Sequence, residues 1–181
     1  FEEGFTLGGK VELIIKNLPV GIGSHIQWDR RLDGKIAQSM MSIPGVKSVE
    51  IGLGENIKNY HGNLSNDEIF YSEKKGYYRK TNFSGGIEGG ISNGEDIVIK
   101  ITMKPIPTQR KPLKTINIVT KEETVAFAQR SDVCAVASLS IVAEAMAAIA
   151  ITEAFMEKFS GDSMEEVKNN FINYQNYVDK R

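Results

Sequence analysis

The sequence predicts an α+β fold in which a long apolar helix lies buried between two other layers. Two observations lead to this prediction: segments 10–17 and 96–103 alternate apolar and polar residues, whereas 135–159 is apolar almost throughout. Alternation is typical of a strand with one buried face, and a helix that is apolar all round is buried on several sides. With 181 residues, of which 41% are hydrophobic and 25% charged, we expect one globular domain over 1–181.

The first third of the chain predicts a strand, a helix and a second strand. Val11, Leu13 and Ile15 share one face of the first strand. We expect Asp29 to cap a helix whose core face repeats every four residues, at Leu32, Ile36 and Met40. Pro44 and Gly45 end that helix, and the next strand is predicted over 46–52.

Segment 53–95 has little periodicity, and a long irregular segment in a compact domain is more often functional than idle. The strand predicted over 96–103 places Ile97, Ile99 and Ile101 on one face. Two prolines in 104–108 prevent this strand from continuing, and 113–119 is a weaker strand candidate.

The apolar helix is followed by a polar one. Glu144 and Glu153 within 135–159 disfavour a membrane span. Ser160 and Gly161 end this helix. The start signal at 162–166 then predicts a final helix to about residue 180.

Composition narrows the classes of function. The net charge of −1 argues against a nucleic-acid partner. A single cysteine, Cys134, excludes an internal disulfide and favours a cytoplasmic protein, as does the absence of a signal-peptide pattern at the start of the chain. His25 and His61 have no metal-ligand spacing and are interpreted as ordinary loop residues, so we expect no metal site.

Three short stretches could carry chemistry, and each has a plainer interpretation. GGIEGG (85–90) either lets the backbone approach a ligand or only supplies turns with positive φ angles. KPIPT (104–108) is either a stiff phosphate clamp or a proline-terminated strand with a solvated lysine. RSDVC (130–134) offers an Arg–Asp pair for an oxyanion and a proton, a surface ion pair, or a helix cap at Asp132.

Taken together, these stretches resemble the C-terminal half of the chorismate synthase family. The resemblance is carried, in order, by MSIPGVKSVEIG (41–52), TNFSGGIEGGISNGEDIVIKITMKPIPT (81–108), RSDVC (130–134) and IVAEAMAAIA (141–150). It implies a β-α-β sandwich with helices held between antiparallel sheets, in a homotetramer. It also implies elimination of phosphate from 5-enolpyruvylshikimate 3-phosphate to give chorismate, with reduced FMN as the cofactor.

The resemblance also implies roles for individual residues. Asp132 matches the aspartate that assists proton removal, and Arg130 is expected near the flavin and the substrate anion. The remaining expected flavin contacts are Pro44, Gly45, Asn82, Gly89, Lys104, Pro105, Ile106, Pro107 and Thr108. Segment 135–140 departs from the family because the proline that many members carry before the apolar helix is absent.

The family's two catalytic histidines, its substrate arginines and its first flavin-binding segment have no match in this sequence. We therefore expect this chain to be inactive by itself. The alternative is a non-catalytic flavin-binding or oligomerisation module, in which the glycines and prolines serve folding and the apolar surface serves assembly.

Overall fold

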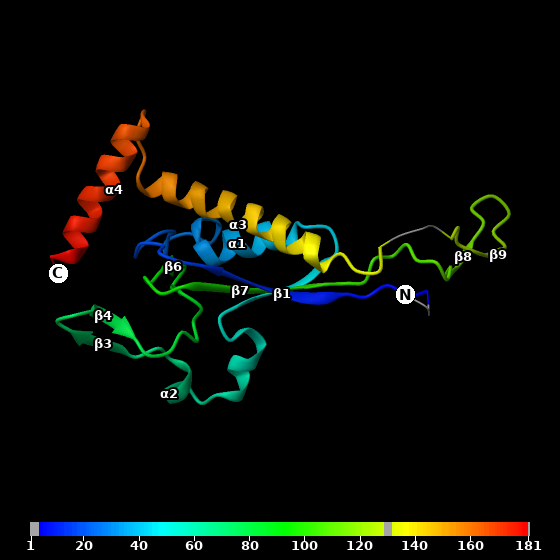
Figure 1. Cartoon of the computed structure of the whole chain (residues 1–181), viewed down its shortest axis with the longest axis horizontal. Helices are drawn as coiled ribbons and strands as arrows, with labels where there is room; N and C mark the ends of the chain where they lie inside the picture. Colours follow the sequence, from blue (N-terminus) through cyan, green and yellow to red (C-terminus); the bar gives the residue numbers. More distant parts are fainter. Residues whose placement is uncertain (1–3, 129–131, 181) are drawn as a thin grey trace.

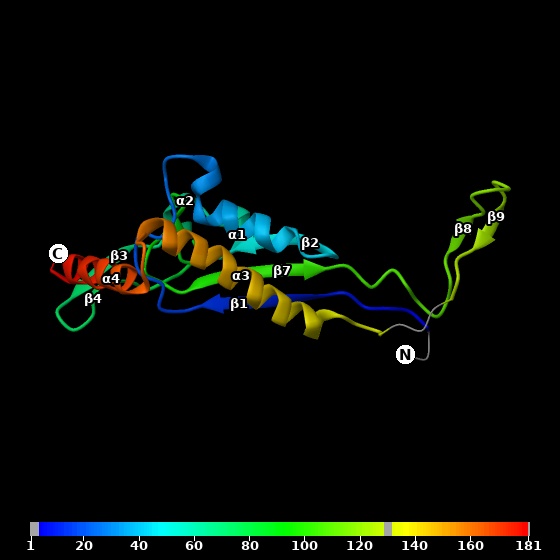
Figure 2. The ribbon, with the colours of Figure 1, turned by 90° about the horizontal axis from the view of Figure 1, so that it is seen from above.

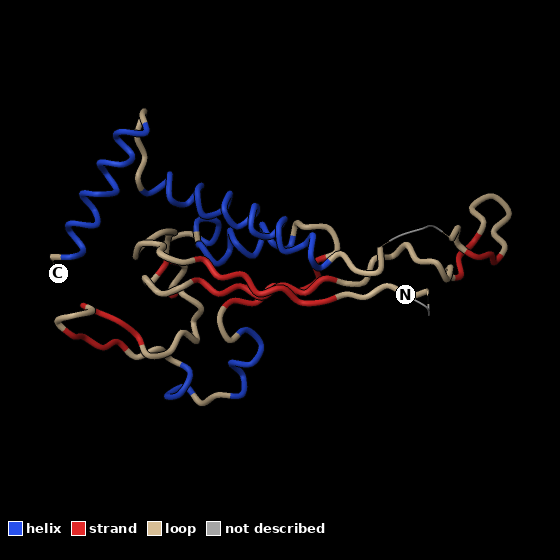
Figure 3. The backbone as a smooth tube through the Cα atoms, in the orientation of Figure 1, coloured by secondary structure: helices blue, strands red, loops and turns tan. Residues whose placement is uncertain are grey.

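The fold is centred on a three-stranded antiparallel sheet with two helices lying along one face (Figures 1 and 3). The computed structural model describes residues 4–128 and 132–180. The sheet order is β1-β7-β2, formed by Gly9–Ile15, Ile97–Met103 and Val46–Ile51. The expected α+β class is confirmed, and all three strands lie close to their predicted bounds.

The middle strand supplies the centre of the core. Ile97, Ile99 and Ile101 are fully buried, as the alternation predicts. Ile99 opposes Leu13 of β1 and Ile51 of β2, so the apolar face runs across the whole sheet. The opposite face is mostly polar, with ion pairs from Glu50 to Lys10 and from Glu12 to Lys100.

The helix α1 (Leu32–Met41) buries the stripe that its four-residue spacing predicts. Its start differs from the prediction. Asp29 lies in a separate 3-10 turn (Trp28–Arg30), and Arg31 holds the N-cap position without a side-chain cap. The Arg31 guanidinium instead pairs with the Asp33 carboxylate at 2.5 Å, so Asp29 is not the cap.

The helix α3 (Val136–Lys158) crosses the same face of the sheet beside α1 (Figure 2). Its buried side consists of one leucine and four alanines, namely Leu139, Ala143, Ala147, Ala150 and Ala154. Small side chains allow the helix to lie close to the sheet and to α1. Asp132 does not cap α3, because Ala135 occupies the N-cap position.

The other side of α3 is apolar but exposed, with Ile141 67% and Ile149 62% accessible. Of the two layers expected around this helix, residues 4–128 and 132–180 therefore supply one. By length and composition α3 is apolar enough to cross a membrane, a property that it shares with core helices of soluble proteins.

The final helix α4 (Met164–Asp179) begins where predicted. The Ser163 hydroxyl accepts a hydrogen bond from the Glu166 amide at 3.2 Å, which is the expected N-cap. Rings of Phe155, Phe159 and Phe171 meet at centroid distances of 4.7–5.3 Å and join α4 to the end of α3.

The segment predicted to be irregular contains short elements of its own. A 3-10 turn (Gly54–Asn59) and α2 (Gly62–Ser65) lead into the hairpin of β3 (Ile69–Ser72) and β4 (Gly76–Arg79). The pair β5 (Ile87–Glu88) and β6 (Ile91–Ser92) follows. The hairpin and α2 lie across the sheet from the helices (Figure 1).

A second hairpin, β8 (Lys114–Ile116) with β9 (Glu123–Val125), projects away from the rest of the fold (Figures 1 and 2). Both strands are exposed along their whole length, and the adjoining Phe127 is 85% accessible. The weak strand predicted over 113–119 is therefore real but contributes nothing to the core.

Candidate functional site

The KPIPT stretch lies just beyond the end of β7. This strand ends at Met103, as the prolines require, and Lys104 is exposed. The Lys104 amide donates to the Gly45 carbonyl at 2.9 Å, so the Pro44–Gly45 turn lies directly beside the lysine backbone. In the described part of the chain, the Lys104 ammonium has no ion-pair partner and is available to an anion.

The N-terminal segment joins KPIPT to the RSDVC stretch. The Thr6 hydroxyl donates to the Ile106 carbonyl at 2.6 Å, and the Leu7 amide donates to the Val133 carbonyl at 2.7 Å. Leu7 and Cys134 also form an isolated parallel bridge. Exposed Asp132 is thus brought to the same end of the sheet as 104–108, whereas Arg130 lies outside the described residues.

Asn82 and Gly89 belong to a second group at the opposite end of β7. The Asn82 side chain donates to the Asp96 carbonyl at 2.7 Å and accepts from the Gly86 amide at 2.8 Å. These contacts lie just before β7 begins, while Lys104 follows its end. Seven strand residues at about 3.3 Å each separate the two groups by roughly 20 Å.

The four glycines of GGIEGG all have positive φ angles, but they differ in their surroundings. A Cβ added to Gly85 would lie 2.3 Å from the Gly52 amide nitrogen, and one on Gly90 would lie 2.7 Å from the Ser24 carbonyl oxygen. Gly86 is enclosed in the same way. A Cβ on Gly89 would meet nothing within 4 Å, so Gly89 is the one glycine of these four that combines a left-handed backbone with open space.

One buried carboxylate near these glycines was missed by the sequence reasoning. Asp67 is 7% accessible and accepts hydrogen bonds from the Thr81 hydroxyl at 2.6 Å and from the Phe83 and Ser84 amides, each at 2.8 Å. Burial disfavours its charged form, but these hydrogen bonds outweigh that cost and lower the pKa of Asp67 below its usual value. An aspartate in a polar segment gives no sequence signal for such a role.

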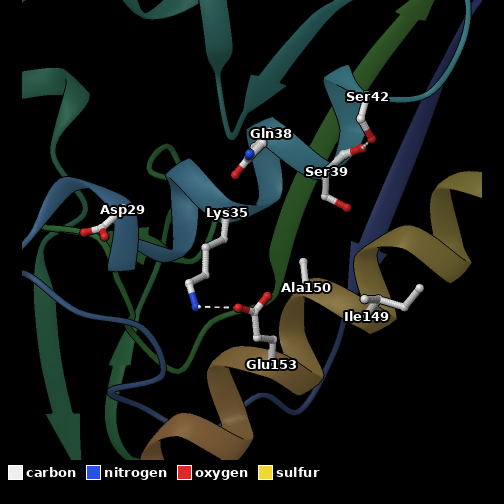
Figure 4. A pocket seen from close by; sticks show the side chains of 8 residues that line it. All are labelled: Asp29, Lys35, Gln38, Ser39, Ser42, Ile149, Ala150 and Glu153. Carbon is white, nitrogen blue, oxygen red and sulfur yellow. Dashed lines mark hydrogen bonds and ion pairs between the residues drawn. The ribbon is translucent and has the colours of Figure 1, made fainter.

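A pocket of about 310 Å³ lies between α1 and α3 (Figure 4). Its lining residues are Asp29, Lys35, Gln38, Ser39, Ser42, Ile149, Ala150 and Glu153. Burial opposes the charge of Lys35, but hydrogen bonds to Glu157 and Glu153 outweigh it and raise the pKa of the ammonium group. The pocket contains none of the predicted site residues. The ion pairs of Lys35 with Glu153 and Glu157 join α1 to α3, so we assign this lysine a structural role.

The two histidines and the cysteine do not belong to either group of predicted site residues. His25 and His61 are exposed, and so is Cys134. Within residues 4–128 and 132–180, no three His, Cys, Asp or Glu side chains form a group that could hold a metal ion.

Comparison with known proteins assigns the chain to a family. The sequence profile described as chorismate synthase matches residues 2–156. The chain belongs to the chorismate synthase family. This resemblance was predicted from the MSIPGV, KPIPT and RSDVC stretches, all of which lie inside the matched region.

Individual relatives agree with this assignment. Chorismate synthase from Geotalea daltonii is 52% identical over 182 residues, covering 97% of this chain and 46% of that protein. Chorismate synthase from Thermoanaerobacter pseudethanolicus is 54% identical over 176 residues, covering 97% and 50%. A crystal structure of chorismate synthase aligns with a TM-score of 0.82 and 47% identity, covering 99% of this chain and 46% of the other. The chain thus spans about half the length of the chorismate synthases it matches.

Proposed function

We propose that this chain is the C-terminal, flavin-binding portion of a chorismate synthase. In that role it contributes to the conversion of 5-enolpyruvylshikimate 3-phosphate to chorismate and phosphate by a trans-1,4 elimination, in the cytoplasm and within a homotetramer. The observation that carries the proposal is the exposed Lys104 ammonium, which has no ion-pair partner among the described residues and stands on a proline-stiffened segment beside Pro44 and Gly45.

The donor set at this end of the sheet fits the phosphate of FMN. Lys104 supplies a cation and Thr108 a hydroxyl, while Pro105 and Pro107 restrict the backbone between them. The Ile106 carbonyl is already held by Thr6, which further fixes the segment. Such a support binds an anion with little loss of conformational entropy.

Reduced FMN, when bound, supplies an electron-rich ring beside the substrate, although the reaction has no net redox change. The exposed Asp132 carboxylate, near the clamp through the Leu7 contacts, is the proposed proton acceptor. Arg130 is the proposed partner of the substrate anion. Gly89 is the proposed close approach to the flavin, because open space surrounds the position that a side chain would occupy.

The strand β7 separates the clamp by roughly 20 Å from the loop that precedes the strand, and this separation favours the homotetramer. Both ends of β7 belong to one rigid sheet, so we propose that Lys104 and Gly89 of one chain contact different flavins. Two copies can, if the clamp of one chain meets the glycine turn of another. The exposed apolar side of α3 is the proposed contact with the second sheet of the sandwich.

The alternative is an oligomerisation module that binds no flavin. The fully exposed β8–β9 hairpin and the apolar side of α3 favour it, since both offer apolar area without offering chemistry. Flavin binding separates the two functions, because assembly alone requires no affinity for FMN.

The test titrates the chain with FMN and with riboflavin, which lacks the phosphate. We expect Lys104→Ala to weaken FMN binding about tenfold or more and to leave riboflavin binding unchanged. Lys16→Ala is the matched control, because Lys16 is an exposed lysine just beyond β1, at the other end of the sheet. Equal loss of both flavins in Lys104→Ala would contradict the clamp. Turnover by this chain with reduced FMN and no second polypeptide would contradict its role as a portion of the enzyme.

A further inference from the structure

The glycine turn is attached to the rest of the fold through the loop that precedes it. Three donors from Thr81, Phe83 and Ser84 converge on the two oxygens of the Asp67 carboxylate. Asp67 lies between α2 and β3, 14–17 residues before its partners. The carboxylate therefore fixes the Thr81–Ser84 backbone from outside that loop.

The fixed loop in turn determines where the glycines lie. Asn82, at the middle of the loop, accepts from the Gly86 amide with its side chain and from the Gly85 amide with its backbone carbonyl at 3.2 Å. The Gly85 carbonyl accepts from the Val98 amide at 3.2 Å, and Gly86 from Asn93 at 3.0 Å. One series of hydrogen bonds thus runs from the Asp67 carboxylate to the first residues of the glycine turn.

A second set of contacts fixes the far side of the same turn. The Glu88 carboxylate, next to Gly89, pairs with the Arg79 guanidinium at 2.5 Å. It also accepts a hydrogen bond from the side-chain amide of Asn93 at 3.0 Å. The Arg79 backbone amide donates to Glu95 at 3.0 Å. Glu88 is held on this side of the turn, and the Asp67 loop contributes the contacts to Gly85 and Gly86 on the other side.

We propose that Asp67 is a positioning residue that holds the Gly85–Gly90 turn in the geometry in which Gly89 approaches the flavin. The claim that Gly89 approaches the flavin rests on the proposed function. The claim that Asp67 holds the turn rests on the hydrogen bonds alone. Asp67 acts only through the loop, so its loss displaces the turn without touching the phosphate clamp at Lys104 about 20 Å away.

The chosen variant is Asp67→Asn, which keeps the shape but replaces one accepting oxygen with an NH₂ group. That group faces a donor, either the Ser84 amide or the Phe83 amide. Thr81→Val removes a single donor and leaves the carboxylate charged, so it serves if Asp67→Asn does not fold. Glu68→Gln is the matched control, because Glu68 is exposed and adjacent in sequence.

Amide hydrogen exchange and flavin titration are measured on the same samples. We expect Asp67→Asn to speed exchange over 83–90 about tenfold or more, with the β7 amides at 97–103 unchanged. FMN and riboflavin binding should weaken by the same factor, because the defect lies at the turn and not at the phosphate. Thr81→Val should give a smaller change of the same kind, Thr81→Ser should restore the native values, and Glu68→Gln should change neither.

Two results would overturn the proposal. Unchanged exchange over 83–90 would show that Asp67 does not hold the turn, and equally faster exchange in β7 would show a general loss of stability. A third result would separate the two claims: the wild-type chain binds neither flavin up to millimolar concentration, but the exchange difference persists. This result would overturn the proposed function and would still support the claim that Asp67 holds the turn.

Discussion

Replacing Gly89 with alanine separates the cost of a left-handed backbone from the loss of a ligand-facing surface. Gly89 has φ +60° and no atom within 4 Å of the position of an added Cβ. Gly76, in the β3–β4 hairpin, has φ +65° and the same open surroundings, so it is a matched control in another element. In each case the substitution should lower the free energy of unfolding by about 1–2 kcal/mol, because alanine is strained in the left-handed conformation and meets no other atom.

The two variants should therefore lose similar stability in urea denaturation and differ in flavin binding. In Gly89→Ala the methyl group occupies the space through which we propose that the flavin approaches, so we expect FMN affinity to fall at least about tenfold, or about 1.4 kcal/mol. Gly76→Ala should bind FMN like the wild-type chain.

A third variant tests whether the open space around Gly89 is what distinguishes it. Gly85→Ala would place its Cβ 2.3 Å from the Gly52 amide nitrogen, so it should lose clearly more stability than the 1–2 kcal/mol of the backbone conformation alone. If Gly89→Ala and Gly76→Ala weaken FMN binding equally, or neither does, then Gly89 does not face the flavin and the reasoning fails.

Three further predictions concern stability and assembly. Because folding lowers the pKa of Asp67, its carboxylate stabilises the fold at pH values above its unfolded pKa of about 3.9. This stabilisation is lost as the pH falls through the folded-state pKa. The urea midpoint of the wild-type chain should therefore drop in acid, and that of Asp67→Asn should drop less. Ala147→Leu should cost about 1–3 kcal/mol in urea denaturation because Ala147 lies on the buried side of α3, whereas exposed Ala148→Leu should be nearly neutral. The double variant Ile141→Glu with Ile149→Glu should reduce self-association in sedimentation velocity and leave the monomer folded by circular dichroism; unchanged association would exclude this side of α3 from the interface.

The elements that sequence predicted well are those in which local pattern and burial agree. The alternation of Ile97, Ile99 and Ile101 follows directly from a strand with one covered face, and all three are fully buried. The Ser163 cap is equally local, since donor and acceptor are three residues apart. Family resemblance then singled out KPIPT and the glycine turn as parts of the proposed site, but no pattern along the chain could indicate that these two stretches lie at opposite ends of β7.

What the sequence did not reveal depends on contacts between distant residues or on close competition between neighbours. Asp67 acquires its role from partners 14–17 residues away, which an acidic residue in a polar segment does not indicate. Asp29 offers a good cap, yet the helix starts three residues later because a 3-10 turn intervenes. Uniform hydrophobicity of α3 predicted burial on several sides, but composition cannot say which chain segment covers each side.

The separation of Lys104 from Gly89 leads to a complementation test of the assembly. If the clamp of one copy and the turn of another form each site, a site is intact only when Lys104 comes from the Gly89→Ala variant and Gly89 from the Lys104→Ala variant. Random assembly of equal amounts of the two variants should then give about one quarter of the sites wild-type affinity for FMN, although neither variant binds tightly alone. Refolding the variants together and counting tight sites by fluorescence titration measures this fraction. A site contained within one chain predicts no tight sites at any mixing ratio, because every chain then carries a defect.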